Sequence, residues 1–297
     1  MPLEPWRHVM LIGGGWALIG GALDDFLELP PRWKLLLQLA ACGSVIAFGF
    51  HPSTFDLPFG SIELGVISST VVAVIVTLFL MNIFNFMDGM DGQASIFGVV
   101  TGLGLALYLG NHGIKYGFGI TWSGMLAAGN AAIASATLLG VLAYNYPGRD
   151  VSSKTFLGDC GSQFYGFILA VIALHAGEGP VEQRFPWIAS LILFSPFVYD
   201  VAFTLVRRIR RGENLTQAHR SHLYQRLMVA GWSHGQALKF NIVLYLMALA
   251  LAWAYAANAG HGWRQMAILL LTGCLLAVYT LFVVQVEESL ARRRVAR

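Results

Sequence analysis

The segment VVAVIVTLFLMNIFNFMDGMDGQAS (residues 71–95) changes abruptly from apolar to polar. Its first half is as apolar as a helix that crosses a bilayer. Its second half carries Asn82, Asn85, Asp88 and Asp91, with Gly89 at the point where we expect the helix to break. No lysine or arginine lies in this segment to neutralise the two carboxylates. The segment therefore predicts a membrane helix that ends in an acidic, polar site.

The composition of the whole chain agrees with a membrane protein. The 297 residues are 56% hydrophobic and only 12% charged, whereas soluble domains carry about 25% charged residues. The three cysteines are dispersed and odd in number, so they predict neither a disulfide framework nor a metal site. We expect one transmembrane domain over residues 1–297, and no nucleic-acid partner.

Apolar segments recur along the chain with lengths close to the ~20 residues that a bilayer crossing needs. They predict an all-α integral membrane protein, a polytopic bundle of about nine transmembrane helices, because lipid cannot satisfy open backbone groups. The segments are 9–23, 34–50, 64–83, 93–110, 124–144, 162–177, 187–206, 236–257 and 265–284.

The basic residues indicate the orientation of these spans. All but four of the 19 lysines and arginines fall on one side, and the four exceptions are Arg7, Lys115, Arg184 and Arg264. The richer side is predicted to be cytoplasmic. The C-terminus is then cytoplasmic, and residues 51–65 form an external loop with a small hairpin as one option. No internal repeat is evident.

Four polar clusters fall on the predicted cytoplasmic side. They are Asp24-Asp25, the 82–91 segment, FLGDCGS (156–162) and HRSHLYQR (219–226). A bundle brings such helix ends to one membrane surface, so we expect an active site built from cytoplasmic loops. Carboxylate and amide oxygens at Asn82, Asn85 and Asp88 share one side of a helix and suit Mg²⁺, or Mn²⁺, together with substrate phosphates. Solvated acids at a helix end are the alternative.

The other clusters carry complementary chemistry. An adjacent acid pair such as Asp24 and Asp25 tends to raise one pKa, which suits a general base or a metal contact. Lys34 suits a phosphate contact, and snorkelling at the interface is its alternative. A glycine-flanked Asp159 at a helix N-terminus suits an approaching phosphate, or is a helix cap.

Histidine and arginine near position 220 suit oxyanion binding at neutral pH. His219, Arg220 and His222 form this group, and a solvated amphipathic loop is the alternative reading. Asp200 lies inside the seventh predicted span, where an acid is a functional candidate by default. A structural ion pair or hydrogen bond is equally consistent with its position, two turns before Arg207 and Arg208.

These motifs resemble those of the polyprenyl-phosphate N-acetylhexosamine-1-phosphate transferases, glycosyltransferase family 4. NIFNFMDGMDG is similar to the family's NxxNxxDGxDG motif, and LIGGALDDFLELPPRWKLLLQ (18–38) to its DD motif and the helix start after it. KTFLGDCGSQFYGF (154–167) matches the F-x-GD-x-GS loop. AHRSHLYQRL (218–227) resembles the histidine motif of the branch that initiates O-antigen synthesis, not the HHHxE type of the phospho-MurNAc-pentapeptide transferase.

The resemblance implies roles for individual residues. It assigns Asp159 and Asn85 to Mg²⁺, Asp24 or Asp25 to a base acting on the lipid phosphate, and Asp88 to an essential acid. It assigns the following to substrate binding: Lys34 near the phosphates, Asn82, Asp91 near the uridine, Phe156 beside uracil, and His219, Arg220 and His222 toward the diphosphate or sugar.

The implied reaction transfers N-acetylhexosamine-1-phosphate from a UDP-N-acetyl amino sugar to undecaprenyl phosphate and releases UMP, at the inner membrane of a bacterium. The sequence leaves the amino sugar open, and a homodimer is an option that the resemblance allows. Family members usually begin with two further spans and a Pro-Arg-Gly-Gly-like motif, which this chain is expected to lack. The alternatives are a non-catalytic lipid-binding scaffold and a membrane transporter, although transporters place their ionisable groups near the midplane.

Overall fold

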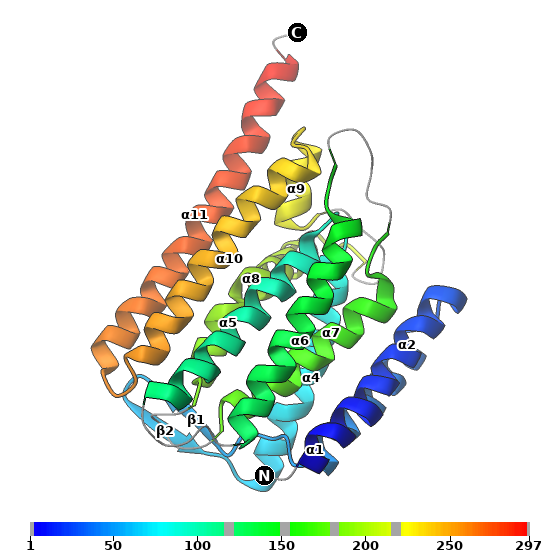
Figure 1. Cartoon of the computed structure of the whole chain (residues 1–297). Coiled ribbons are helices and arrows are strands. Elements are labelled where there is room, and N and C mark those ends of the chain that lie inside the picture. The colour runs from blue at the N-terminus through cyan, green and yellow to red at the C-terminus, as the bar shows by residue number, and fades with distance from the viewer. Residues whose placement is uncertain (1–2, 116–121, 149–154, 179–183, 215–220, 296–297) are drawn as a thin grey trace.

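The computed structural model describes residues 3–115, 122–148, 155–178, 184–214 and 221–295. It is a bundle of long helices with one small hairpin at its lower end (Figure 1). The elements are α1 (Leu3–His8), the π-helical turn η1 (Val9–Gly13), α2 (Gly14–Leu27), α3 (Pro31–Ala47), β1 (Thr54–Leu57), β2 (Gly60–Glu63), α4 (Val66–Met87), α5 (Gln93–Lys115), α6 (Trp122–Asn145), α7 (Gly158–Ala176), α8 (Trp187–Arg210), α9 (Leu223–Val229), α10 (His234–Ala257) and α11 (Gly262–Val295).

Each of the nine predicted apolar segments is helical over most of its length, which confirms the all-α membrane class. Seven helices of the described chain are long and apolar enough to cross a membrane. They are Pro5–Leu27, Val66–Met87, Gln93–Asn111, Gly124–Asn145, Trp187–Arg210, His234–Ala257 and Gly262–Ser289. Helices α3 and α7 do not belong to this set, so the count of nine spans stays a prediction.

Helix α7 lies at the centre of the bundle and is surrounded by protein. Nearly every side chain from Gln163 to Leu174 is buried in protein, so α7 needs little contact with lipid. Glycines let its neighbours approach closely: a Cβ on Gly166 would come within 2.6 Å of the backbone of α4, and one on Gly21 within 2.4 Å of the backbone at Asp159. Small residues serve the same purpose in membrane helix packing generally.

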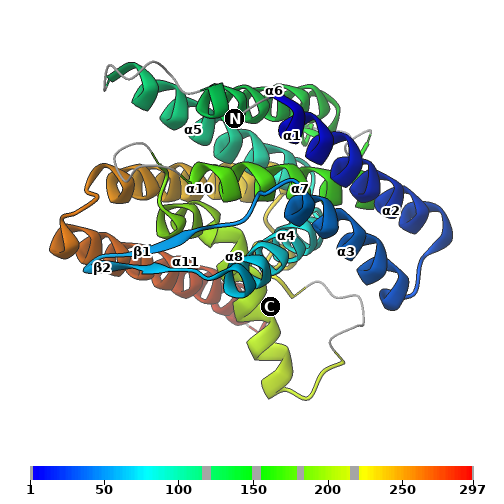
Figure 2. The same cartoon turned by 90° about the horizontal axis from the view of Figure 1, so that it is seen from below.

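The hairpin closes the end of the bundle that is opposite to the acidic clusters. Strands β1 and β2 pair antiparallel across the turn at residues 58–59, as the sequence allowed. Arg184 donates to Thr54 Oγ1 at 2.8 Å and pairs with Asp56, which ties β1 to the start of α8. Figure 2 shows the hairpin lying across this end of the helices.

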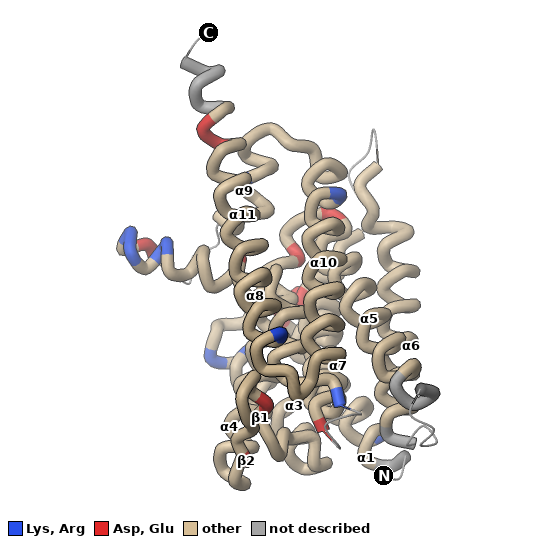
Figure 3. The backbone as a smooth tube through the Cα atoms, turned by 90° about the vertical axis from the view of Figure 1, so that its left-hand side faces the viewer, with Lys and Arg blue, Asp and Glu red and all other residues tan. Residues whose placement is uncertain are grey.

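Long stretches of the helices contain no charged residue. Figure 3 shows most of the tube without lysine, arginine, aspartate or glutamate. The C-terminal ends of α2 and α4 and the N-terminal ends of α3 and α7 lie at the same end of the bundle, because the helices alternate in direction (Figure 1). That end carries the candidate site.

Candidate active site

Asp24 and Lys34 meet across the turn between α2 and α3. Glu28, in the left-handed region at φ 48°, ends α2, and Pro31 in the first turn begins α3. This tight connection places the Lys34 ammonium in an ion pair with the Asp24 carboxylate. The backbone N–H of Leu29 donates to the other Asp24 oxygen at 3.0 Å. Asp24 is thereby held rigidly, with only 4% of its surface exposed.

Asp159 faces this pair from the first turn of α7. Lys34 Nζ lies 3.8 Å from Asp159 Oδ2, so the lysine sits between two carboxylates. Asn85, near the end of α4, donates through Nδ2 to Asp159 Oδ1 and to Ser162 Oγ, the latter at 3.1 Å. Three segments that are far apart in sequence, the α2–α3 connection, the end of α4 and the start of α7, therefore converge on one cluster, formed by Asp24, Lys34, Asn85 and Asp159.

Asp25 turns to a different partner from its neighbour Asp24. Its two oxygens accept the backbone N–H groups of Asp159 and Cys160, at 2.9 and 3.0 Å. Gly158, at φ +65°, begins α7, and a Cβ there would lie 3.0 Å from Asp25 Oδ2. A carboxylate that accepts two N–H groups at a helix N-terminus stabilises that terminus. Asp25 therefore holds the backbone that carries Asp159.

Asp88 lies directly after α4 and next to the same cluster. Its Oδ1 atom is out of contact with water and has no hydrogen-bond partner among the described residues. Burial raises the pKa of Asp88 to about 8; the backbone N–H of Gly158 opposes this rise, and the charges of Asp159 and Asp25 add to it. Without a bound cation, Asp88 is therefore mainly protonated near neutral pH.

We expect Asp88→Asn to stabilise the metal-free protein, and more so at about pH 7.5 than at about pH 5. The pKa of Asp88 in the folded protein, about 8, lies above the ordinary aspartate value of 3.8. Between these values the unfolded chain releases a proton that the folded protein keeps, so stability falls as pH rises, and asparagine removes that loss. Thermal unfolding in EDTA measures the difference in Tm. If the difference in Tm between Asp88→Asn and wild type stays constant or shrinks from about pH 5 to about pH 7.5, the raised pKa is contradicted. Asp56→Asn, which breaks the Arg184 ion pair, is the control and should instead lower Tm.

The second half of the DGMDG segment folds into a tight turn that is anchored from α6. Gly92, at φ +73°, donates its N–H to Asn145 Oδ1 at 2.6 Å. Asn145 Nδ2 donates to the carbonyl oxygen of Thr155 at 2.6 Å. Asn145 is fully buried and joins the 88–92 turn to the loop before α7. A single asparagine at a helix end gave no signal of this role in the sequence.

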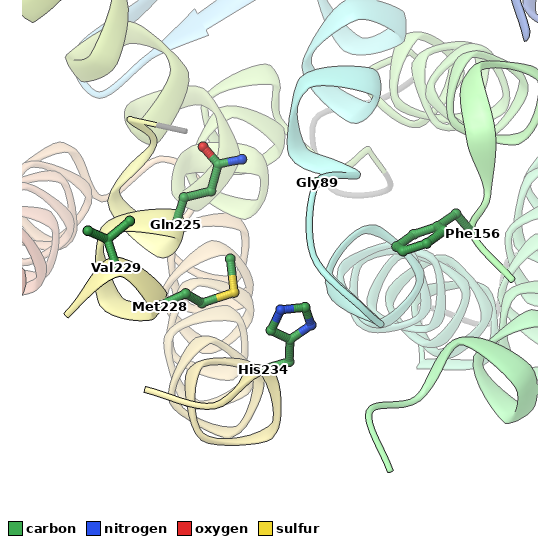
Figure 4. A pocket seen from close by; sticks show the side chains of 6 residues that line it. All are labelled: Gly89, Phe156, Gln225, Met228, Val229 and His234. Atoms are coloured by element: carbon green, nitrogen blue, oxygen red, sulfur yellow. The ribbon is translucent and has the colours of Figure 1, made fainter. Parts of the chain in front are cut away.

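A pocket of about 370 Å³ opens beside this turn. Figure 4 shows Phe156 on one side, His234 and Met228 on the other, and Gly89 between them; Gln225 and Val229 complete the lining. Asp91, almost fully buried, pairs with His234 Nδ1 at 2.9 Å. Phe156 is 55% exposed, so its ring is available to a planar ligand. Neither His234 nor Gln225 belonged to the residues predicted for substrate.

His222 is buried and contacts an acid from the membrane-embedded part of α8. Its Nδ1 lies 3.0 Å from Asp200 Oδ1, and the N–H groups of Leu223 and Tyr224 donate to Asp200 at 2.9 and 3.2 Å. Asp200 therefore fixes the start of α9, the helix that carries Gln225 and Met228 into the pocket. His219 and Arg220 lie outside the described residues.

The donor set of the cluster fits a hard divalent cation. Asp159, Asp88 and the carbonyl oxygen of Asn85 are oxygen ligands, and Asp88 presents a buried oxygen without a partner in the described chain. Among the described residues no group of three or more His, Cys, Asp and Glu side chains forms a complete metal cage. Mg²⁺ takes only one or two protein oxygens where substrate phosphates and water complete its shell, so a metal at this cluster stays a prediction.

The structure brings together most of the predicted site residues. Asp24, Lys34, Asn85 and Asp159 form the cluster, with Asp25 and Asp88 beside it, while Phe156 lines the pocket and Asp91 pairs with the pocket residue His234. Asn82 lies one turn deeper and hydrogen-bonds to Gln38. His222 reaches Asp200. The catalytic and binding roles of these residues stay predictions.

Comparison with known proteins gives a consistent result. The sequence profile described as Glycosyl transferase family 4 matches residues 8–177. Decaprenyl-phosphate N-acetylglucosaminephosphotransferase of Mycolicibacterium smegmatis is 28% identical over 267 residues, which cover 84% of this chain and 62% of that protein. The probable undecaprenyl-phosphate N-acetylglucosaminyl 1-phosphate transferase of Bacillus subtilis is 27% identical over 246 residues, covering 82% and 63%.

A third relative is the undecaprenyl-phosphate alpha-N-acetylglucosaminyl 1-phosphate transferase of Escherichia coli K12. It is 27% identical over 262 residues, covering 86% of this chain and 67% of that protein. The chain thus spans a little under two thirds of the length of the M. smegmatis and B. subtilis relatives. The profile match covers more than half of the chain, and it includes the DD, DGMDG and GDCGS motifs of the cluster.

Proposed function

Because the chain belongs to glycosyl transferase family 4, we propose that it transfers an N-acetylhexosamine-1-phosphate from a UDP-sugar to undecaprenyl phosphate and releases UMP. The observation that carries this proposal is the convergence of Asp24, Lys34, Asn85 and Asp159 at one end of a membrane bundle. A polar site at the membrane surface suits a reaction between a water-soluble nucleotide sugar and the phosphate of a lipid. The relatives' names favour N-acetylglucosamine as the sugar.

The arrangement of charges supports a cytoplasmic site in the bacterial inner membrane. Lys34 and the arginines that end α8 lie at the site end, while Arg184 and Arg264 lie near the hairpin. By the positive-inside rule the site end faces the cytoplasm, where UDP-sugars are made. We further propose that the product initiates a cell-envelope polysaccharide such as O-antigen, which the histidine segment at 218–227 favours.

Asp159 and Asn85 would hold Mg²⁺, with Mn²⁺ as a substitute, and Asp88, whose charge interacts with that of Asp159, would take part. When bound, the ion would neutralise the diphosphate of the donor and stabilise the charge that leaves with UMP. The lysine and the acids of the chain then position the reacting groups.

In the proposed step an oxygen of the lipid phosphate attacks the phosphorus that carries the sugar. The bond from this phosphorus to the bridging oxygen breaks, and that oxygen leaves with UMP. Asp24 accepts the proton of the lipid phosphate where one is present, because Asp25 is occupied by the N-terminus of α7. Lys34, between Asp24 and Asp159, pairs with the phosphates as they arrive. The membrane and the fixed cluster supply proximity.

The pocket beside the 88–92 turn is the proposed place of the uridine. Phe156 would stack on the base, and Asp91, oriented by His234, would accept hydrogen bonds from the nucleoside. We propose direct displacement by the lipid. A sugar-phosphate adduct trapped covalently on an aspartate would instead establish a two-step reaction.

Purified protein with undecaprenyl phosphate, Mg²⁺ and a panel of UDP-N-acetyl sugars tests this function. We expect UMP release that requires both the lipid and the metal, that is highest with one sugar, and that EDTA abolishes reversibly. Release of UMP without lipid would indicate hydrolysis instead of transfer. Absence of release from every sugar would contradict the proposal and favour a lipid-binding role.

A further inference from the structure

Three amide side chains form a hydrogen-bonded layer inside the bundle. Gln38 of α3 donates through Nε2 to Asn82 Oδ1 at 3.3 Å and to Gln163 Oε1 at 3.2 Å. Asn82 of α4 donates through Nδ2 to Gln38 Oε1 at 2.9 Å and to the carbonyl of Leu78 at 2.7 Å. Gln38 and Gln163 are only 4% and 3% exposed. We call these residues, Gln38, Asn82 and Gln163, the amide triad.

Each member of the amide triad lies one helical turn below a residue of the cluster. Gln38 follows Lys34 by four positions on α3. Asn82 precedes Asn85 by three on α4, and Gln163 follows Asp159 by four on α7. Residues three or four apart share one side of a helix. Since α4 runs toward the site and the other two helices run away from it, all three amides lie on the inner side of the cluster.

The hydrogen bonds of the amide triad define one register among three helices. If one helix shifts or rotates, the buried Gln38 or Gln163 loses a partner where water does not replace it, and this costs free energy. The single arrangement that pairs all three amides also brings Lys34, Asn85 and Asp159 together. Polar pairs in apolar interiors are known to fix register in this way.

Both donor positions of Asn82 are used in this layer. Its Nδ2 group donates twice and its Oδ1 accepts from Gln38, so only one acceptor position of Oδ1 is left for a substrate. We propose that the amide triad is a positioning layer, and that Asn82 acts through Gln38 and Gln163 on the geometry of the cluster and makes no contact with substrate. This inference rests on the proposed function only for its kinetic readout.

A double-mutant cycle with Asn82→Leu and Gln38→Leu tests the proposal. Each single variant should lower kcat by about 10- to 100-fold, because a misplacement on the order of 1 Å can cost about 10²-fold. KM for the UDP-sugar should stay within about twofold. The double variant should lose no more than the worse single variant, since both substitutions break one network. Tyr199→Phe, which removes a 2.7 Å hydrogen bond between α8 and α11, is the matched control and should keep its activity.

Alkylation of Cys160 gives a second readout that needs no activity. Cys160 follows Asp159 and is half-buried, while Cys42 is fully buried and Cys274 is exposed. In a Cys274→Ser background, maleimide should label Cys160 several-fold faster in Asn82→Leu than in Tyr199→Phe, because the α7 terminus loses its register.

Two results would overturn the positioning layer. One is a rise in KM for the UDP-sugar with kcat unchanged in Asn82→Leu, which would place Asn82 on the substrate. The other is a double variant whose loss in kcat equals the product of the two single losses, together with an unchanged rate of Cys160 alkylation. If the wild-type protein releases no UMP, the proposed function fails separately, and the alkylation rates still decide on the amide triad.

Discussion

Asp159→Asn should lower UMP release by about 10²–10³-fold, the loss that follows removal of one preorganised charge from an active site. Asp159 joins the Asp24–Lys34 ion pair to Asn85, because it contacts both Lys34 and Asn85. Asparagine keeps the size of the side chain and an oxygen, but it removes the negative charge. The proposed metal then loses its principal ligand, and Lys34 keeps only Asp24.

The fold should survive this substitution. The backbone N–H of Asp159 still donates to Asp25, so the cap of α7 does not depend on the Asp159 side chain. Steady-state UMP release and Tm measured on the same preparation separate the two effects. Asp56→Asn, which removes a carboxylate at the hairpin end, is the control and should keep its activity. Activity of Asp159→Asn within about tenfold of wild type would remove Asp159 from the chemistry.

The second large effect is a difference between two adjacent acids. Asp24→Asn should lower UMP release by about 10²–10⁴-fold, the range for loss of a general base, and it should also lower Tm because it breaks the ion pair between the buried Asp24 and Lys34. Asp25→Asn should keep most of the activity, because an amide oxygen still caps α7. Asp25→Ala should lose about 0.5–2 kcal/mol of stability as a lost helix cap. The contrast follows from their partners: Asp24 faces Lys34, and Asp25 accepts two backbone N–H groups.

Activity and thermal unfolding of the three variants decide this assignment. Asp24→Gln would extend the series without restoring a base. The opposite pattern, with Asp25→Asn inactive and Asp24→Asn active, would make Asp25 the base and would reduce Asp24 to a partner of Lys34. Equal losses in both would mean that the pair works as one unit.

Much of the architecture follows from hydropathy and from the placement of polar residues. Apolar segments predicted the helices, and the change of character at Asn82 placed the end of α4 within a few residues of Met87. The alternation of spans was enough to expect that Asp24, Asn85 and Asp159 meet at one surface. Hydropathy does not distinguish lipid from protein as the surroundings of a helix, so the central position of α7 was not predictable.

The finer roles depend on which way adjacent side chains point. Neighbours on a helix differ by about 100° in direction, so Asp24 and Asp25 must differ, but only the structure shows which one caps α7. Asp200 was a candidate for function or for a structural ion pair or hydrogen bond, and the structure shows hydrogen bonds from His222 and from the start of α9. Asn145 carries two loop contacts across the site, and no local pattern signals such a long-range role.

The most direct test of the central claim follows the two phosphates of the donor. Purified protein receives undecaprenyl phosphate, Mg²⁺ and UDP-N-acetylglucosamine labelled with ³²P in either the α- or the β-phosphate. The account predicts that β-label moves into the lipid fraction, that α-label leaves as UMP, and that neither transfer occurs in Asp159→Asn. Release of both labels together as UDP would contradict it, because the enzyme would then transfer the sugar without its phosphate.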